Sequence, residues 1–147
     1  MIDRFNTFTT LINKISRSIL KIKTKEMSKF GLKSTHVSCL YYMYKNEGKL
    51  TARQLCDICQ EDKAAISRSL EYLEEHGYIS CDAKKEKRYK SQLCLTEQGE
   101  KTGREIAEII DNILSKSDMG LTKDEMAVFY KCLGVLSKNL ENISERE

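Results

Sequence analysis

Residues 50–96 constrain the fold more than any other part of the chain, because they combine two short helices with a hairpin. Within them, residues 62–76 predict an amphipathic helix: Asp62 suits the N-cap, and Gly77 suits the position just past the end. Three apolar residues recur at i, i+4 and i+7 and make one buried stripe: Ile66, Leu70 and Leu73. The residues left on the outer face are Lys63, Ala64, Ser67, Arg68 and Glu71.

The outer face of this helix is narrow at its N-terminal end. Ala64, Ala65 and Ser67 have small side chains, so the first two turns are slim enough to enter the major groove of DNA. Many ordinary surface helices are equally slim, and the pattern alone is therefore weak support for DNA binding.

The flanking residues complete a recognisable motif. Thr51 and Gln54 form a capping-box pattern that opens a short helix, with Leu55, Ile58 and Cys59 expected to face inward. Only Gln60 and Glu61 then separate the two helices, as in a tight helix-turn-helix. After Gly77, residues 78–81 and 91–95 predict two short strands, joined by a polar loop over residues 82–90.

This arrangement resembles the winged helix of the multiple-antibiotic-resistance regulator (MarR) family. The resemblance rests on residues 51–55, 63–68 and 73–79, on Arg88, and on Leu95-Thr96-Glu97-Gln98-Gly99. It implies a mainly α, α+β fold of six helices with a two-stranded β-hairpin wing. It also implies an obligate homodimer that binds double-stranded DNA at a pseudo-palindromic operator.

Long amphipathic helices flank this segment on both sides. We expect helices at about residues 3–29 and 34–46, and two more after Thr96, separated near Gly120. Ser34 is the expected N-cap of the second helix, whose buried side is expected to hold Val37, Leu40, Tyr41 and Tyr44. Gly99 and Gly103 are expected to permit close packing against the winged segment, and Thr122 and Glu125 form a second capping box.

We therefore divide a single 1–147 domain into a DNA-binding part, 34–96, and helical dimerisation parts, 1–33 and 97–147. A second copy would cover the long apolar stripes; the alternative is a monomer whose helices fold back. The first helix carries Phe5, Phe8, Ile12, Ile15, Ile19 and Ile22 on its stripe.

Charge at the hairpin supports contact with phosphates. Residues 80–92 hold five basic and two acidic side chains, although the whole chain has a net charge of only +3. A solvated charged loop is the alternative interpretation. The predicted DNA-binding residues are Thr51, Arg53, Lys63, Ala64, Ala65, Ser67, Arg68, Lys87 and Arg88.

Two positions depart from the family's pattern. Relatives often have a glycine and an aliphatic residue where this chain has Gln60 and Glu61, a difference that can change the angle between the helices. In the wing, Lys87 stands where relatives have Asp, and Tyr89 replaces a second Arg. Arg88 remains the best candidate for the wing tip.

The six cysteines are expected to be reduced thiols that pack as small apolar side chains. Cys56 and Cys59 have the spacing of redox and zinc sites, and a metal or redox sensor is the alternative for this pair. Strand alternation places Cys94 on the face opposite Cys81 and Leu95. We expect no cofactor and no bound metal.

The resemblance also implies an effector pocket between the dimerisation and DNA-binding parts. Its candidate residues are His36, Cys39 and Tyr41. The alternatives are ordinary surface contacts for His36 and core packing for Cys39 and Tyr41.

The sequence predicts a DNA-binding transcription regulator of the bacterial cytoplasm, and a repressor released from its operator by a small ligand or oxidant. No catalytic motif or membrane-spanning stretch is present in the 147 residues, so we expect neither an enzyme nor a membrane protein. Two alternatives are a winged-helix protein-interaction module without operator binding and a cysteine-based redox or zinc sensor.

Overall fold

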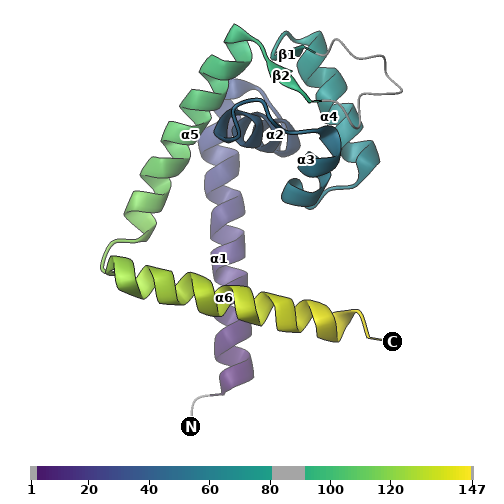
Figure 1. The fold of residues 1–147 in the computed structure, drawn as a ribbon. Helices are drawn as coiled ribbons and strands as arrows, with labels where there is room; N and C mark the ends of the chain where they lie inside the picture. The colour runs from purple at the N-terminus through teal and green to yellow at the C-terminus, as the bar shows by residue number, and fades with distance from the viewer. Residues whose placement is uncertain (1–2, 81–91, 147) are drawn as a thin grey trace. The chain divides into compact units, whose positions relative to one another are not determined.

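The structure, a computed structural model, describes residues 3–80 and 92–146. The chain divides into two compact units, Met1–Ile109 and Ile110–Glu147. We describe each unit by itself (Figure 1). Within residues 3–80 and 92–146, no helix combines the length and the apolar character needed to cross a membrane.

The first unit begins with a long helix, α1 (Arg4–Met27), followed by the 3-10 turn η1 (Ser28–Phe30). The Asp3 carboxylate caps α1 by accepting a hydrogen bond from the Asn6 amide at 3.1 Å. Gly31 ends the turn with φ +65°, a left-handed conformation that glycine adopts without strain. The helix expected over residues 3–29 is thus confirmed to within two residues.

The second helix, α2 (Ser34–Lys45), starts differently from the expectation. Ser34 was expected to be its N-cap, but the cap is the extended residue Lys33, and Ser34 is already helical. The reason is His36, whose Nδ1 accepts a hydrogen bond from the Lys33 backbone N–H at 3.2 Å. This side chain satisfies a donor at the start of the helix, so a serine cap is not needed.

The helix-turn-helix consists of α3 (Ala52–Cys59) and α4 (Lys63–Glu75). The predicted capping box is present, because Thr51 and Gln54 exchange hydrogen bonds of 3.2 Å and 2.8 Å. Leu55 is buried as expected. Ile58 is 39% exposed, so its predicted inward orientation is wrong. It lies three residues beyond Leu55, at the edge of a helix too short to bury a wide face.

The wing pairs β1 (Ile79–Ser80) with β2 (Cys94–Leu95) in antiparallel register, Ile79 opposite Leu95. A single bridge joins Thr51 to Gln92, and the Leu93 amide donates to the Leu50 carbonyl at 2.9 Å. The two predicted strands are confirmed at these paired residues, whereas their ends at Cys81 and Ser91 lie outside the described residues.

Helix α2 lies between α5 (Glu97–Ser117) and the α3–α4 pair and supplies the centre of the core (Figure 1). Met43 is fully buried, whereas Tyr41 and Tyr44, which were expected on the buried side, are only half-buried. Val37 and Leu40 are buried as expected. The buried surface of α2 is wider than expected and includes Met43, because α5 packs on one side of the helix and the α3–α4 pair on the other. The largest fully buried side chains are Leu40, Met43, Leu55, Ile66, Leu73, Leu93 and Ile106.

The start of α5 packs very closely against the wing. A Cβ built on Gly99 would lie 1.9 Å from the Tyr78 carbonyl oxygen, and one on Gly103 would lie 2.7 Å from Tyr44 Cβ. Only glycine fits at Gly99, and the expectation that both glycines permit close packing is confirmed. Thr96 fixes the junction by donating to the Gly77 carbonyl at 2.6 Å and accepting from the Gly99 amide at 3.1 Å.

The second unit joins the end of α5 to α6 (Lys123–Ser144) through a turn in which Gly120 has φ +92°. The predicted second capping box is confirmed. The Thr122 amide donates to Glu125 Oε2 at 2.7 Å, and the Glu125 amide donates to Thr122 Oγ1 at 3.1 Å.

Helices α1 and α6 each carry a row of exposed apolar side chains. All six residues of the predicted α1 stripe are exposed, from 38% at Ile12 to 78% at Phe5. On α6, Phe129, Leu136 and Leu140 are each more than 40% exposed. Contiguous apolar surface of this extent is typical of a face that binds another protein chain.

Candidate nucleic-acid interface

The outer face of α4 is held in a fixed orientation by its cap and its buried stripe. The Asp62 carboxylate accepts a hydrogen bond from the Ala65 amide at 2.7 Å, which sets the first turn. Ile66, Leu70 and Leu73 are buried as predicted. The residues that consequently face outward are Lys63, Ala64, Ser67 and Arg68, with Ala65 half-buried beside them.

Two further predicted DNA contacts lie at the start of α3. Arg53 is exposed on the first turn of α3, and Thr51 precedes it in the bridge to Gln92. This bridge ties the returning strand of the wing to the start of the helix-turn-helix. The two predicted wing contacts, Lys87 and Arg88, lie outside the described residues.

The turn between α3 and α4 contains the main departure from the family's pattern. Gln60 has φ +54° and ψ +44°, so it adopts the left-handed conformation that a glycine adopts without strain. Its Nε2 donates to the Asp57 carbonyl at 2.7 Å, and the Glu61 amide donates to the Cys56 carbonyl at 3.2 Å. These local bonds hold the turn in shape without a glycine.

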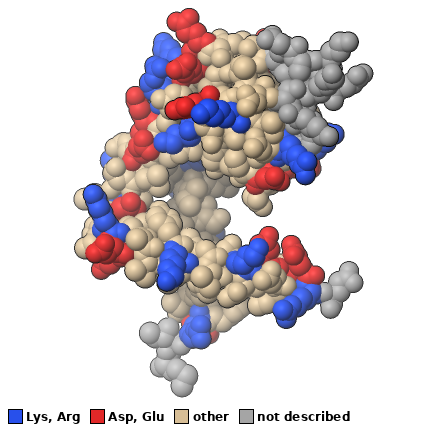
Figure 2. Space-filling view, viewed as in Figure 1, with Lys and Arg blue, Asp and Glu red and all other residues tan. Residues whose placement is uncertain are grey.

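The start of α4 already holds a carboxylate, because Asp62 caps the helix and Glu61 precedes it. The partial positive charge of the helix N-terminus is therefore satisfied within the chain. On the face shown in Figure 2, basic and acidic side chains are interspersed over the described residues. Attraction to phosphate therefore depends on particular side chains such as Lys63 and Arg68.

Three stacked rings, those of His36, Tyr72 and His76, join α2 to α4. The ring of Tyr72 stacks on His36 at 4.2 Å on one side and on His76 at 3.9 Å on the other. His36 is only 6% exposed, so the expected surface contacts are wrong. Burial lowers the pKa of His36, and the nearby charges of Lys33 and His76 lower it further.

His36 also lines a shallow hollow of about 370 Å³. The other lining residues are Lys33, Thr35, Ala65, Arg68, Ser69 and Tyr72. Of the three candidate effector residues, His36 alone lines this hollow. Cys39 is fully buried in the core, and Tyr41 is half-buried with its ring edge-on to Tyr42 at 5.1 Å. The structure therefore does not bring the three together around one cavity.

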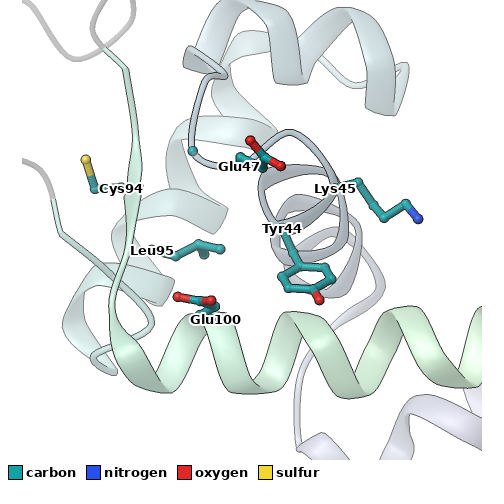
Figure 3. Close-up of a pocket in the computed structure, with 7 residues that line it drawn as sticks. Tyr44, Lys45, Glu47, Cys94, Leu95 and Glu100 are labelled. Carbon is teal, nitrogen blue, oxygen red and sulfur yellow. The ribbon is translucent and has the colours of Figure 1, made fainter.

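A larger hollow of about 630 Å³ lies between the end of α2, β2 and the start of α5 (Figure 3). Leu95 extends from β2 toward Tyr44, and the Tyr44 ring lies above α5, whereas the Cys94 side chain leaves the other side of its strand. This confirms the orientation predicted for Cys94. Glu47 and Glu100 bring carboxylates to the hollow, and it has few apolar walls to hold an uncharged ligand.

The thiols occupy different environments. Cys39 is buried, Cys56 and Cys59 are half-buried, and Cys94 and Cys132 are exposed. Sequence reasoning missed that Cys39 and Cys59, which belong to different helices, affect each other's acidity: Cys59 raises the pKa of Cys39, and Cys39 lowers the pKa of Cys59. Among the described residues, no three His, Cys, Asp or Glu side chains gather closely enough to hold a metal ion.

Comparisons with known proteins agree with this geometry. A sequence model described as the MarR family matches residues 30–88, which include the helix-turn-helix and part of the wing. A curated relative, the HTH-type transcriptional regulator YwoH of Bacillus subtilis (strain 168), is 30% identical over 95 residues. The match covers 65% of this chain and 68% of that protein.

Solved structures are similar over nearly the whole chain. The MarR family regulator NMB1585 from Neisseria meningitidis superposes with a TM-score of 0.81 at 21% identity, covering 99% of this chain and 100% of that one. MepR of S. aureus, solved as a DNA complex, has a TM-score of 0.79 at 19% identity, covering 94% of this chain and 99% of that one. At these identities the likeness establishes the fold.

Proposed function

The chain belongs to the MarR family, and from that membership we propose that it is a DNA-binding transcription regulator acting in the cytoplasm rather than an enzyme. The observation that carries the proposal is the outward face of α4. Its small residues Ala64 and Ser67 lie between Lys63 and Arg68, all of them exposed on a helix whose buried stripe fixes its rotation.

This face suits direct readout of bases. Small side chains let the helix approach the floor of the major groove, where each base pair presents a distinct set of donors and acceptors. Lys63 and Arg68 flank them and can reach phosphates or guanine edges. MepR, which shares the fold, was solved as a complex with DNA, and this supports DNA binding by the present chain.

The other predicted DNA-binding residues are proposed to contact the DNA backbone or the minor groove. Thr51 and Arg53 lie at the start of α3, where they suit contacts to the phosphate backbone. Lys87 and Arg88 are proposed to contact phosphates or a narrow minor groove from the wing. Such contacts set the affinity and the register of the protein on DNA, whereas the α4 face sets the sequence preference.

We propose that the binding unit is a homodimer. The exposed apolar residues of α1 and α6 supply the surface, and a two-fold dimer presents two copies of α4 to a pseudo-palindromic operator. Within this proposal, residues 34–96 are the DNA-binding part, and residues 1–33 and 97–147 are the dimerisation parts. Repression, and release by a small ligand, are the finer parts of the same proposal.

Two variants test the proposed roles of α4 and of the wing separately. An operator would first be selected from a random pool of DNA and its binding followed as a function of salt. Ala64→Leu should erase the preference for operator over random DNA and leave low-salt binding intact, because a bulky residue blocks the groove. A mismatched base pair costs about 1–3 kcal/mol, so a loss of this size is measurable.

Arg88→Ala should instead weaken operator and random DNA together. Each phosphate contact contributes about 0.9 to the slope of log affinity against log salt, so a dimer should lose about 2. Glu75→Leu is the matched control for Ala64→Leu, because it places the same leucine at the far end of α4, and it should leave the preference for operator unchanged. If Arg88→Ala removes the sequence preference but not the salt slope, the proposed division of roles is wrong.

A further inference from the structure

The shallow hollow of about 370 Å³ between α2 and α4 is lined by two buried polar side chains, Ser69 and His36. Ser69 is 5% exposed, and its hydroxyl makes no hydrogen bond within residues 3–80 and 92–146. His36 is 6% exposed and uses Nδ1 as an acceptor, so its ring proton is on Nε2, for which the same residues supply no acceptor. Buried polar groups are nearly always paired, so two unpaired ones beside a hollow point to a ligand.

Two cations line the same hollow. Lys33 and Arg68 are both exposed, and neither forms an ion pair within the part of the chain that the structure describes. None of the described lining residues is acidic. The hollow therefore favours an anionic group that can accept hydrogen bonds.

The start of α2 adds backbone donors beside these cations. Its N-cap Lys33 and its first-turn residue Thr35 line the hollow, and the first turn holds no acidic residue. Helix α4 is capped by the Asp62 carboxylate, whereas a lysine side chain has no acceptor atom to cap α2. The first amides of α2 thus keep the partial positive charge with which helix N-termini bind phosphate groups.

The position and depth of the hollow favour a phosphate of DNA over a free anion. Ala65 and Arg68 line it and also belong to the α4 residues predicted to meet DNA. Sites for small molecules enclose most of their ligand, whereas this hollow is shallow. It therefore suits a group presented on a polymer.

We propose that this hollow binds one phosphate of the operator backbone, held by the charges of Lys33 and Arg68 and by the buried donors of Ser69 and His36. The inference rests on the proposed function and extends it, because Lys33 and Ser69 are not among the predicted DNA-binding residues. A phosphate held between α2 and α4 fixes the distance of α4 from the DNA backbone. Such a contact carries no sequence information by itself.

Ser69→Ala tests the buried donor. It should weaken binding to operator and to random DNA alike, about tenfold, because a hydrogen bond to a charged group is lost. The salt slope should stay unchanged, since no charge is removed. The melting temperature should not fall, because the hydroxyl has no partner in the described part of the free protein. Ser38→Ala, a half-buried serine on α2 outside the hollow, is the matched control and should bind DNA like the wild type.

Lys33→Met tests the charge. For a dimer it should flatten the slope of log affinity against log salt by about 2, because one phosphate contact is lost in each protomer. Lys45→Met removes an exposed lysine from the other end of α2 and should leave the slope unchanged.

Neutral methylphosphonate linkages, placed one at a time along the operator, identify the phosphate. One position in each half-site should weaken wild-type binding and have less effect on Ser69→Ala, because the hydroxyl and the phosphate charge belong to one contact. That position should differ from those whose effect depends on Arg88.

The histidine rings give a measurement that does not need DNA. The chain has only two histidines, and the rings of His36 and His76 stack on opposite sides of Tyr72. Inorganic phosphate at millimolar concentration, at constant pH and ionic strength, should shift the ring ¹⁵N signals of His36 more than those of His76. Ser69→Ala should reduce this shift.

Three results would overturn the proposal. They are wild-type DNA affinity in both Ser69→Ala and Lys33→Met, loss of base preference in Ser69→Ala, and saturation of His36 by micromolar inorganic phosphate, which would assign the hollow to a free anion. If the wild type binds no DNA at all, the proposed function fails. In that case the His36 signals still report on the hollow by themselves, and signals that phosphate leaves unchanged would exclude a phosphate site there.

Discussion

At the scale of single residues, His36 links the start of α2 to the recognition helix. Its Nδ1 accepts from the Lys33 amide, so the proton of the neutral ring is on Nε2. One face of the ring stacks on Tyr72 of α4. A proton on Nδ1 would remove the acceptor of this hydrogen bond and place a charge in a buried site beside Lys33. The neutral form therefore belongs to the folded protein.

His36 should accordingly make stability depend on pH. Its pKa is lowered in the folded chain, so the unfolded chain binds more protons, and stability is lost as pH falls below about 6.5. His36→Gln keeps an acceptor but cannot titrate. The urea midpoint should fall less for His36→Gln than for the wild type between about pH 7.5 and pH 5.5. Equal falls would show that His36 does not contribute.

At the scale of elements, the turn between α3 and α4 depends on a residue other than glycine in the left-handed region. Gln60 has φ +54°, and such a conformation costs an ordinary residue about 1–2 kcal/mol relative to the right-handed one. The hydrogen bond from its side chain to the Asp57 carbonyl offsets part of this cost. The angle between the two helices is set here.

Substitution at Gln60 should test this strain. Gln60→Val should destabilise the fold by about 1–2 kcal/mol, because a β-branched side chain fits the left-handed region poorly. Gln60→Asn is the matched control and should remain close to wild type, since asparagine tolerates this conformation. Chemical denaturation measures both. Equal stability of the two variants would mean that the turn relaxes to another conformation.

The elements that sequence could predict are those with local signals. The capping boxes at Thr51 and Thr122 and the glycines after helix ends act within about four residues, and the helix boundaries they predict are confirmed. The width of the buried surface of α2 was not predictable in the same way. Met43 is buried beside the expected Val37 and Leu40 because several elements pack around the helix, and no local signal carries that information.

The same distinction applies to the candidate site. The apolar stripe of α4 predicted its buried residues, and the placement of Lys63, Ser67 and Arg68 on the outside follows from helical geometry. The ring column through Tyr72 and the close packing of Gly103 against Tyr44 each join different helices. Contacts of this kind arise from tertiary packing, which periodicity does not encode.

At the scale of the whole molecule, the apolar faces of the long helices are the dominant feature. Leu136 on α6 is 43% exposed and Ile19 on α1 is 59% exposed, both within rows of similar side chains. Each apolar side chain of this size gains about 1.5–3 kcal/mol when fully buried. A second copy of the chain would bury both rows in a dimer interface. Because this burial stabilises only the dimer, we expect dimerisation and folding to be coupled.

Leu136→Glu should therefore break the dimer and lower the melting temperature together. Lys138→Glu is the control, because it adds the same acidic group to an exposed position two residues away on the helix. Sedimentation equilibrium should give twice 17.0 kDa for the wild type and the control at micromolar concentration. The wild-type melting temperature should also rise with protein concentration. A monomer mass for the wild type would contradict the coupling.

Because Gly99 and Gly103 pack closely against Tyr78 and Tyr44, the winged segment should not be transferable without the start of α5. A graft of the winged segment that stopped at Thr96 would leave behind the helical turns that cover Tyr44 and Tyr78, together with the buried Ile106 and Ala107. The smallest transplantable module therefore extends to about Ile109, where the first compact unit ends. Recombination between family members should preserve function only when the crossover falls beyond that point.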